Sequence, residues 1–236
     1  MEPLTSAGFL IVRIVPRQDW HSPTLLPPRL LSASFCISPQ FPGPYSLRWV
    51  DASDASRVDA FEKFGVAAPL REPAIAWSTE RFEGVFGWPG TFYDVQDALA
   101  ARRRFCASED EIVVIGLGLS AGHAEEFLEY VAPTANRPVP MGRSGVSEMI
   151  SQCEPLPKGG QLLGFELLDV EYGQISHSWL CNQLEVHCFQ TLGIRPGAYG
   201  LLADLETAAQ CCAEVRKDSV GKEPGLWLPW AIVRYA

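Results

Sequence analysis

The residues Gly118-Leu119-Ser120-Ala121-Gly122 form the pattern G-x-S-x-G, which can present a serine hydroxyl as a nucleophile. Ser120 directly follows a continuous apolar run at 111–119 and directly precedes a segment, 121–131, with the apolar spacing of a helix. A sharp turn between a strand and a helix would hold the hydroxyl of Ser120 above a sheet edge, where small neighbours avoid steric clashes. This arrangement predicts nucleophilic attack on an ester carbonyl.

This turn resembles the nucleophile turn of α/β-hydrolases, and the resemblance implies a downstream acid followed by a downstream histidine. Asp169 and His177 are the candidates for these two roles, and His187 is a second candidate for the histidine. Both histidines fall in the segment 176–192, which we predict to be helical, whereas that family presents its histidine on a loop. No His-Gly segment precedes the strand to complete an oxyanion hole. A serine hydrolase using Ser120, Asp169 and His177 is therefore the alternative hypothesis.

Gly116, Gly118 and Gly122 have two further interpretations. Their spacing is close to that of a dinucleotide-binding turn, but no acidic residue closes a second strand about 20 positions further on. The simpler interpretation is that these small residues let the helix at 121–131 pack closely against the preceding strand. We favour packing, and the sequence predicts no cofactor.

His177, Cys181 and Cys188 would share one face of the helix predicted at 176–192. Imidazole and thiolate groups bind zinc, but ligands from one helix alone make an incomplete site. The chain has seven cysteines and no C-x-x-C pair, so the commonest zinc and dithiol signatures are absent from the sequence. A nucleophilic pair of His177 and Cys181 lacks a residue that would orient the histidine. We therefore predict no metal site and expect most of the cysteines to be core residues.

The net charge of −9 is distributed unevenly. Residues 105–236 contain 17 Asp and Glu residues against 8 Lys and Arg residues, whereas residues 1–104 contain 11 of each kind. An acidic surface repels nucleic acid and anionic membranes and attracts basic proteins. The carboxylates that we predict to contact a basic partner are Glu125, Glu126, Glu129, Glu166, Asp169 and Glu171. A solvated face without a partner is the alternative interpretation of the same residues.

The elements that must position these residues differ between the two parts of the chain. Eight of the nineteen prolines lie within residues 1–44, which predicts short strands, at 9–15, 30–37 and 45–50, joined by stiff loops. Apolar periodicity predicts helices at 54–64, 94–104, 121–131, 146–153, 176–192 and 204–217, and strands at 74–77, 111–119, 161–172 and 226–235. We therefore expect an α/β or α+β fold with a mixed central sheet flanked by helices and a proline-rich N-terminal part of strands and loops.

The domain organisation and the cellular compartment follow from the same features. We predict a single domain over residues 1–236, or two closely packed halves, 1–131 and 142–236, on either side of the proline-rich segment at 132–140. No apolar stretch approaches the length of about 20 residues that a membrane span needs, and no export signal is recognisable. With an odd number of cysteines, this predicts reduced thiols and a cytoplasmic protein.

The stretch 163–202 resembles segments of small cytoplasmic bacterial proteins of the toxin-immunity type. The residues that carry the resemblance are Gly164-Phe165-Glu166, the segment from His177 to Asn182, Leu192-Gly193-Ile194 and Gly200-Leu201. The resemblance implies a non-enzymatic protein that neutralises a cognate toxin acting in the cytoplasm by covering the toxin's active site. A nuclease-like toxin would present a basic surface that the acidic residues complement. Such an immunity protein is our favoured hypothesis.

Overall fold

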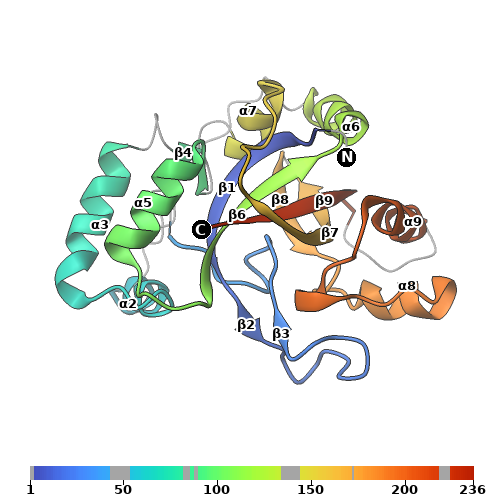
Figure 1. The fold of residues 1–236 in the computed structure, drawn as a ribbon, viewed down its shortest axis with the longest axis horizontal. Helices are drawn as coiled ribbons and strands as arrows, with labels where there is room; N and C mark the ends of the chain where they lie inside the picture. Colours follow the sequence, from blue (N-terminus) through green and yellow to red (C-terminus); the bar gives the residue numbers. More distant parts are fainter. Residues whose placement is uncertain are drawn as a thin grey trace.

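The structure, a computed structural model, describes residues 3–42, 54–81, 86–87, 90–133, 144–171, 173–217 and 224–236 (Figure 1). Its strands are β1 (Thr5–Arg13), β2 (Val15–Pro16), β3 (Arg29–Leu30), β4 (Phe86–Gly87), β5 (Thr91–Phe92), β6 (Ile112–Leu119), β7 (Gln161–Glu171), β8 (Gln174–Ser178) and β9 (Leu226–Tyr235). Its helices are α2 (Asp54–Glu62), α3 (Ala68–Glu80), α5 (Val95–Phe105), α6 (Ala121–Val131), α7 (Gly145–Ser151), α8 (Leu184–Leu192), α9 (Leu205–Val215) and the 3-10 helix η1 (Ala198–Gly200). The predicted strand at 45–50 and most of the predicted boundary at 132–140 lie outside the described residues.

Within the described residues, seven strands form one sheet in the order β4-β5-β1-β6-β9-β7-β8, and each pairing is antiparallel. Every residue of β6 is buried, as expected for a strand covered on both faces. β9 pairs with both β6 and β7, so the sheet contains strands from both sides of the predicted boundary. The predicted class, with a central sheet flanked by helices, is confirmed. The prediction that this sheet is mixed is wrong for the described residues, because all of its pairings are antiparallel, as is typical of the α+β form.

Successive side chains of β6 point to opposite faces of the sheet, so this strand contributes core residues to both faces. On one face, Ile115 packs in a cluster with Phe127 of α6 and Ile150 of α7. On the other face, Val114 packs in a cluster with Phe105 of α5. Figure 1 shows α2, α3 and α5 gathered at one end of the molecule and α8 and α9 at the other. The described helices include none that is long and apolar enough to cross a bilayer.

Most of the regular elements after residue 90 lie where the sequence predicts them. The strands predicted at 111–119, 161–172 and 226–235 correspond to β6, β7 and β9, with small differences at their ends. The helices predicted at 121–131 and 204–217 correspond to α6 and α9. Asp204 caps α9 by accepting a hydrogen bond from the backbone N–H of Thr207 at 2.8 Å, as its position before the helix predicts.

Three predicted elements are wrong. The strand predicted at 74–77 lies inside α3. The helix predicted at 176–192 begins only at Leu184, because residues up to Ser178 pair with β7 as strand β8 and Gln183 has a left-handed φ of 53°. The strand predicted at 30–37 contributes only its first residue to β3. The residues after Ser34 form a turn, in which the backbone N–H groups of Ile37 and Ser38 bond to the Ser34 carbonyl.

Candidate functional site

Two of the six carboxylates predicted to form a partner-binding surface are buried. Glu166 and Asp169 lie in β7 and are both 0% exposed. β7 lies between β9 and β8, and neighbouring elements cover the sheet at both positions. The prediction that Glu166 and Asp169 contact a partner is therefore wrong.

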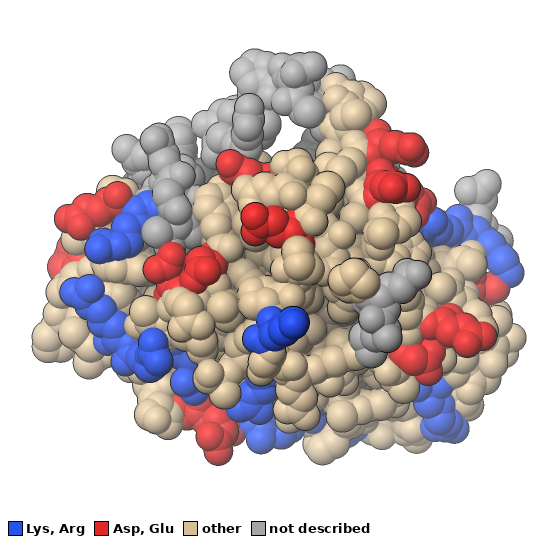
Figure 2. Space-filling model, turned by 45° about the horizontal axis from the view of Figure 1, so that its top comes forward, with Lys and Arg blue, Asp and Glu red and all other residues tan. Residues whose placement is uncertain are grey.

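The remaining four carboxylates differ in their accessibility. Glu126 forms an ion pair with Arg216, with oxygen–nitrogen distances of 2.9 and 3.2 Å. Glu125 and Glu129 are exposed on α6, and Glu171 is partly exposed at the end of β7. On the face drawn in Figure 2, acidic and basic side chains of the described residues are interspersed. This view therefore shows no separate acidic field on that face.

The described residues do not assemble the triad predicted for a hydrolase. Nδ1 of His177 lies 3.6 Å from Sγ of Cys36, whereas Oγ of Ser120 lies 2.7 Å from Nδ1 of His123. Asp169 is buried in β7, opposite Trp227 of β9. The strand before Ser120 also has antiparallel neighbours on both sides, unlike the central strands of a parallel sheet. The assignment of Asp169 and His177 as partners of Ser120 is wrong.

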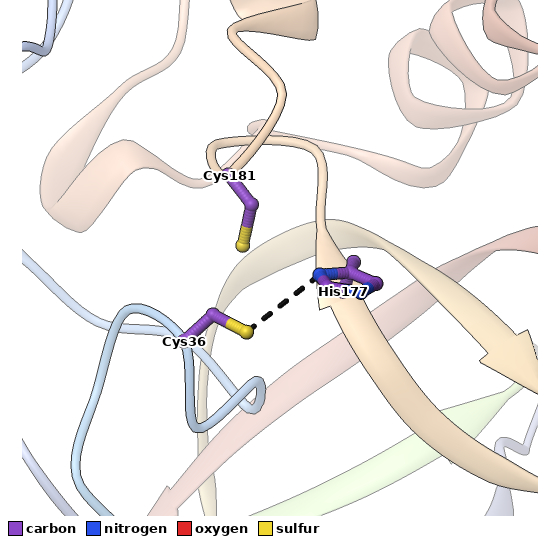
Figure 3. A group of neighbouring side chains, drawn as sticks. All are labelled: Cys36, His177 and Cys181. Carbon is purple, nitrogen blue, oxygen red and sulfur yellow. Dashed lines mark hydrogen bonds between the residues drawn. The ribbon is translucent and has the colours of Figure 1, made fainter. Parts of the chain in front are cut away.

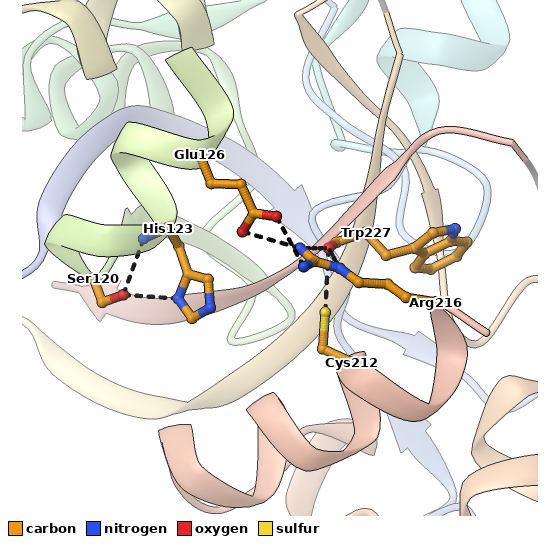
Figure 4. Close-up of polar contacts among 6 residues, drawn as sticks. All are labelled: Ser120, His123, Glu126, Cys212, Arg216 and Trp227. Carbon is orange, nitrogen blue, oxygen red and sulfur yellow. Dashed lines mark hydrogen bonds and ion pairs between the residues drawn. The ribbon is translucent and has the colours of Figure 1, made fainter. Parts of the chain in front are cut away.

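Ser120 caps α6 and contacts His123 twice (Figure 4). Its Oγ accepts a hydrogen bond from the His123 backbone N–H at 3.4 Å and lies 2.7 Å from His123 Nδ1. Burial lowers the pKa of His123, so the imidazole is neutral near pH 7 and the serine hydroxyl can donate to Nδ1.

The glycines around Ser120 do not serve to let α6 pack on the strand, because the atoms nearest to Gly116 and Gly118 belong to other parts of the chain. A Cβ added at Gly116 or Gly118 would lie 2.8 Å from Tyr235 or 2.6 Å from Leu156, so these two positions have no space for a side chain. A Cβ added at Gly122 would meet no atom within 4 Å, so packing does not require this glycine.

Cys36, His177 and Cys181 form a cluster of three metal-ligating side chains (Figure 3). The two sulfur atoms and one imidazole nitrogen all lie within 4.8 Å of one another. Cys36 comes from the turn after β3, His177 from β8, and Cys181 from the turn after β8. Cys36 is exposed while His177 and Cys181 are half-buried, so the cluster reaches the surface.

Hydrogen bonds hold the Cys36 turn against β8. Ser34 Oγ donates to the Ser176 carbonyl at 2.8 Å, and the backbone N–H of Cys36 donates to Ser34 Oγ at 3.3 Å. On the other side of the contact, the backbone N–H of Ser178 donates to Cys181 Sγ at 3.4 Å. These bonds fix both segments of the cluster at the end of β8.

The buried carboxylate of Glu166 joins the same two segments. It accepts hydrogen bonds from Ser32 Oγ at 2.5 Å, from the Ala33 backbone N–H at 2.9 Å and from Ser178 Oγ at 2.6 Å. Burial raises the pKa of Glu166 to about 7, although these three bonds act in the opposite direction. Glu166 is thus a shared anchor for the turn that carries Cys36 and the strand end between His177 and Cys181.

The thiols of the cluster have opposite pKa shifts. The hydrogen bond from Cys181 lowers the pKa of Cys36 to about 5, with smaller contributions from Ser34 and His177. The hydrogen bond to Cys36 and burial together raise the pKa of Cys181. The exposed thiol of Cys36 is therefore the more acidic member of the pair.

The sequence placed His177 and Cys181 near each other but did not indicate their third partner. Cys36 is 141 residues before His177 in the chain and belongs to no recognised ligand motif. The expectation that most cysteines are core residues is wrong, because only three of the seven, Cys188, Cys211 and Cys212, are buried. Only the pairing of distant segments brings Cys36 to the site.

No protein-family profile, no curated protein and no solved structure matches this chain. Some of the residues that carry the toxin-immunity resemblance are neighbours in the fold, because Glu166 bonds to Ser178 and Phe165 forms a bridge with Leu202, beside Gly200-Leu201. The chemical assignment of the site therefore depends on the geometry of its own residues.

Proposed function

We propose that this protein binds a zinc ion through Cys36, His177 and Cys181, at a site with an open fourth position. The observation that carries the proposal is the convergence of two thiols and one imidazole from separate segments, with all ligand atoms within 4.8 Å. Zinc is favoured because thiolate and imidazole ligands select it over magnesium and calcium, which prefer oxygen ligands.

The spacing of the cluster fits tetrahedral coordination. Zinc–sulfur bonds of about 2.3 Å and zinc–nitrogen bonds of about 2.0–2.1 Å place a sulfur and a nitrogen ligand about 3.6 Å apart. The distance from Cys36 Sγ to His177 Nδ1 is 3.6 Å. Little rearrangement of these two side chains would therefore accompany metal binding.

The protonation state of the cluster also suits a cation. The thiol of Cys36 loses its proton more readily than a free cysteine, because the contact with Cys181 lowers its pKa. Binding a cation would displace the proton from Cys181, whose pKa is raised without metal. Zinc affinity is therefore expected to increase with pH through the neutral range.

The open position suggests Lewis-acid chemistry. Structural zinc sites usually have four protein ligands, whereas catalytic sites have three and keep one position for water or substrate. Cys36 is exposed and its neighbour Phe35 is 64% exposed, so solvent can reach this side of the cluster. A zinc-bound water at this position would be the group that acts on a substrate.

The test is zinc titration of chelator-treated protein, combined with cobalt substitution. We expect one equivalent of zinc to bind and cobalt to show sulfur-to-metal charge-transfer absorption. Replacing Cys36, His177 or Cys181 with Ala should lower zinc affinity by more than about 100-fold, because each supplies a direct ligand. Cys153→Ser is the matched control, because Cys153 is an exposed free cysteine outside the cluster. Equal affinities of the wild type and the Cys181→Ala variant would contradict the proposal.

A second candidate is binding of a basic toxin by α6. Glu125 and Glu129 are exposed one turn apart, and Tyr130 beside them is 43% exposed, a residue type common in binding hot spots. Reversing both charges to Lys should weaken binding of a basic toxin domain encoded beside the gene by about tenfold or more. The matched control reverses Glu72 and Glu206, which are exposed on other helices. Equal effects of the two double reversals would argue against this surface.

A further inference from the structure

We infer that Ser120 and His123 form a nucleophile–base pair that hydrolyses esters with an apolar acyl group. The site is separate from the zinc cluster, and the inference does not depend on metal binding. It rests on the 2.7 Å contact from Ser120 Oγ to His123 Nδ1 (Figure 4). It also rests on a pocket of about 420 Å³ that Ser120 lines.

The pocket has the size and lining of a small-molecule site. Ligand pockets commonly measure about 300–1,000 Å³ and combine an apolar wall with a few polar groups. Its apolar wall includes Leu4, Leu162, Phe165 and Leu205. Asp204 also lines the pocket, but its carboxylate already accepts the hydrogen bond that caps α9. Among these lining residues, Ser120 supplies the hydroxyl group, which lies against His123 and would act as the nucleophile. The apolar wall would select an apolar acyl group.

His123 is suited to act as the base. Its pKa is lowered by burial, so Nδ1 can accept a proton near neutral pH. Glu126, on the same helix, raises the pKa of His123, whereas Arg216, its ion-pair partner, lowers it. The carboxylate of Glu126 would thus stabilise the imidazolium that forms during the reaction.

The reaction needs only an ester and water. Ser120 Oγ attacks the carbonyl carbon while its proton moves to His123 Nδ1, and the carbonyl oxygen becomes an oxyanion. Collapse of this intermediate breaks the ester carbon–oxygen bond, and the departing alkoxide takes the proton from His123. Water then attacks the acyl-serine with His123 again as the base. Breaking the acyl–Ser120 bond releases the carboxylic acid and returns the proton to Ser120.

The test is labelling by an alkyl fluorophosphonate together with hydrolysis of p-nitrophenyl butyrate. We expect a phosphonyl adduct on Ser120 of the wild type and none on Ser120→Ala or Ser120→Asp. The Asp variant keeps an acceptor to cap α6 and lacks the nucleophile, so it separates loss of chemistry from loss of folding. His123→Gln should slow hydrolysis by about 100-fold or more, as expected for loss of a general base.

Two controls distinguish this site from other serines and from the zinc cluster. Ser144→Ala removes another serine that caps a helix and should leave labelling unchanged. Chelator treatment should also leave it unchanged. An unlabelled wild type, an adduct on a residue other than Ser120, or loss of labelling with the chelator would overturn the inference.

Discussion

The Glu166→Ala variant is expected to lose about 3 kcal/mol or more of its free energy of unfolding, and about 10- to 100-fold of its zinc affinity. Removing the carboxylate leaves the hydroxyls of Ser32 and Ser178 and the N–H of Ala33 without their acceptor in a buried site. It also leaves a cavity in a position that is 0% exposed. Zinc affinity should fall because residues that hold metal ligands in position typically contribute about 10- to 100-fold to the affinity for the metal. Urea unfolding and zinc titration measure the two effects.

Glu171→Ala is the matched control, because Glu171 lies on the same strand but is partly exposed. We expect a change within about 0.5 kcal/mol for this variant. Equal losses in the two variants would show that Glu166 is not an anchor.

Glu166→Gln adds a test of pH dependence. The folded-state pKa of Glu166 is raised to about 7 from an ordinary value of 4.5. An acid whose pKa is raised on folding costs stability as pH increases from the unfolded to the folded pKa. The stability of the wild type should therefore fall relative to the Gln variant between about pH 4.5 and pH 7, and then stay level.

The Gly164→Ala variant is expected to lose about 3 kcal/mol of its free energy of unfolding. Gly164 lies at a bulge in β7 with a φ of +149°, a conformation that L-residues rarely adopt. A Cβ there would lie 2.6 Å from the backbone oxygen of Leu202. This oxygen accepts a hydrogen bond from the Phe165 N–H at 2.8 Å, so the added methyl group would disturb backbone pairing.

Gly122→Ala provides the comparison for Gly164. Gly122 lies within α6, and an added Cβ meets no atom within 4 Å. Alanine is the better helix former, so this variant should gain up to about 1 kcal/mol. The unfolding temperature should therefore fall for Gly164→Ala and rise for Gly122→Ala. An unchanged unfolding temperature of Gly164→Ala would show that the bulge tolerates a side chain.

The fold could be predicted wherever a local pattern decides the structure. The apolar run of β6 and the cap at Asp204 have local causes, and both are confirmed. β8 was mistaken for helix because its conformation depends on pairing with β7, which lies earlier in the chain. The order and direction of the strands likewise depend on pairing between distant segments, which apolar periodicity does not reveal.

The candidate site was less predictable for the same reason. His177 and Cys181 are close in the sequence, and both are residue types that bind zinc, so they could be recognised as candidate ligands. Cys36 joins them only through the serine-rich turn that bonds to Ser176 and Glu166. The burial of Glu166 and Asp169 was not predicted either. The sequence of β7 alone does not show that other elements cover both faces of this strand.

The position of β9 has a consequence for synthesis of the chain. β9 follows β6 and β7 in the sequence but lies between them in the sheet. A nascent chain that ends before residue 226 therefore has two open strand edges and lacks Trp230, which packs on Phe127 in the core. Open edges of this kind pair with other chains, so such intermediates are prone to aggregate on the ribosome. Pairing of β9 with β6 and β7 covers these two inner edges and joins the two parts of the sheet.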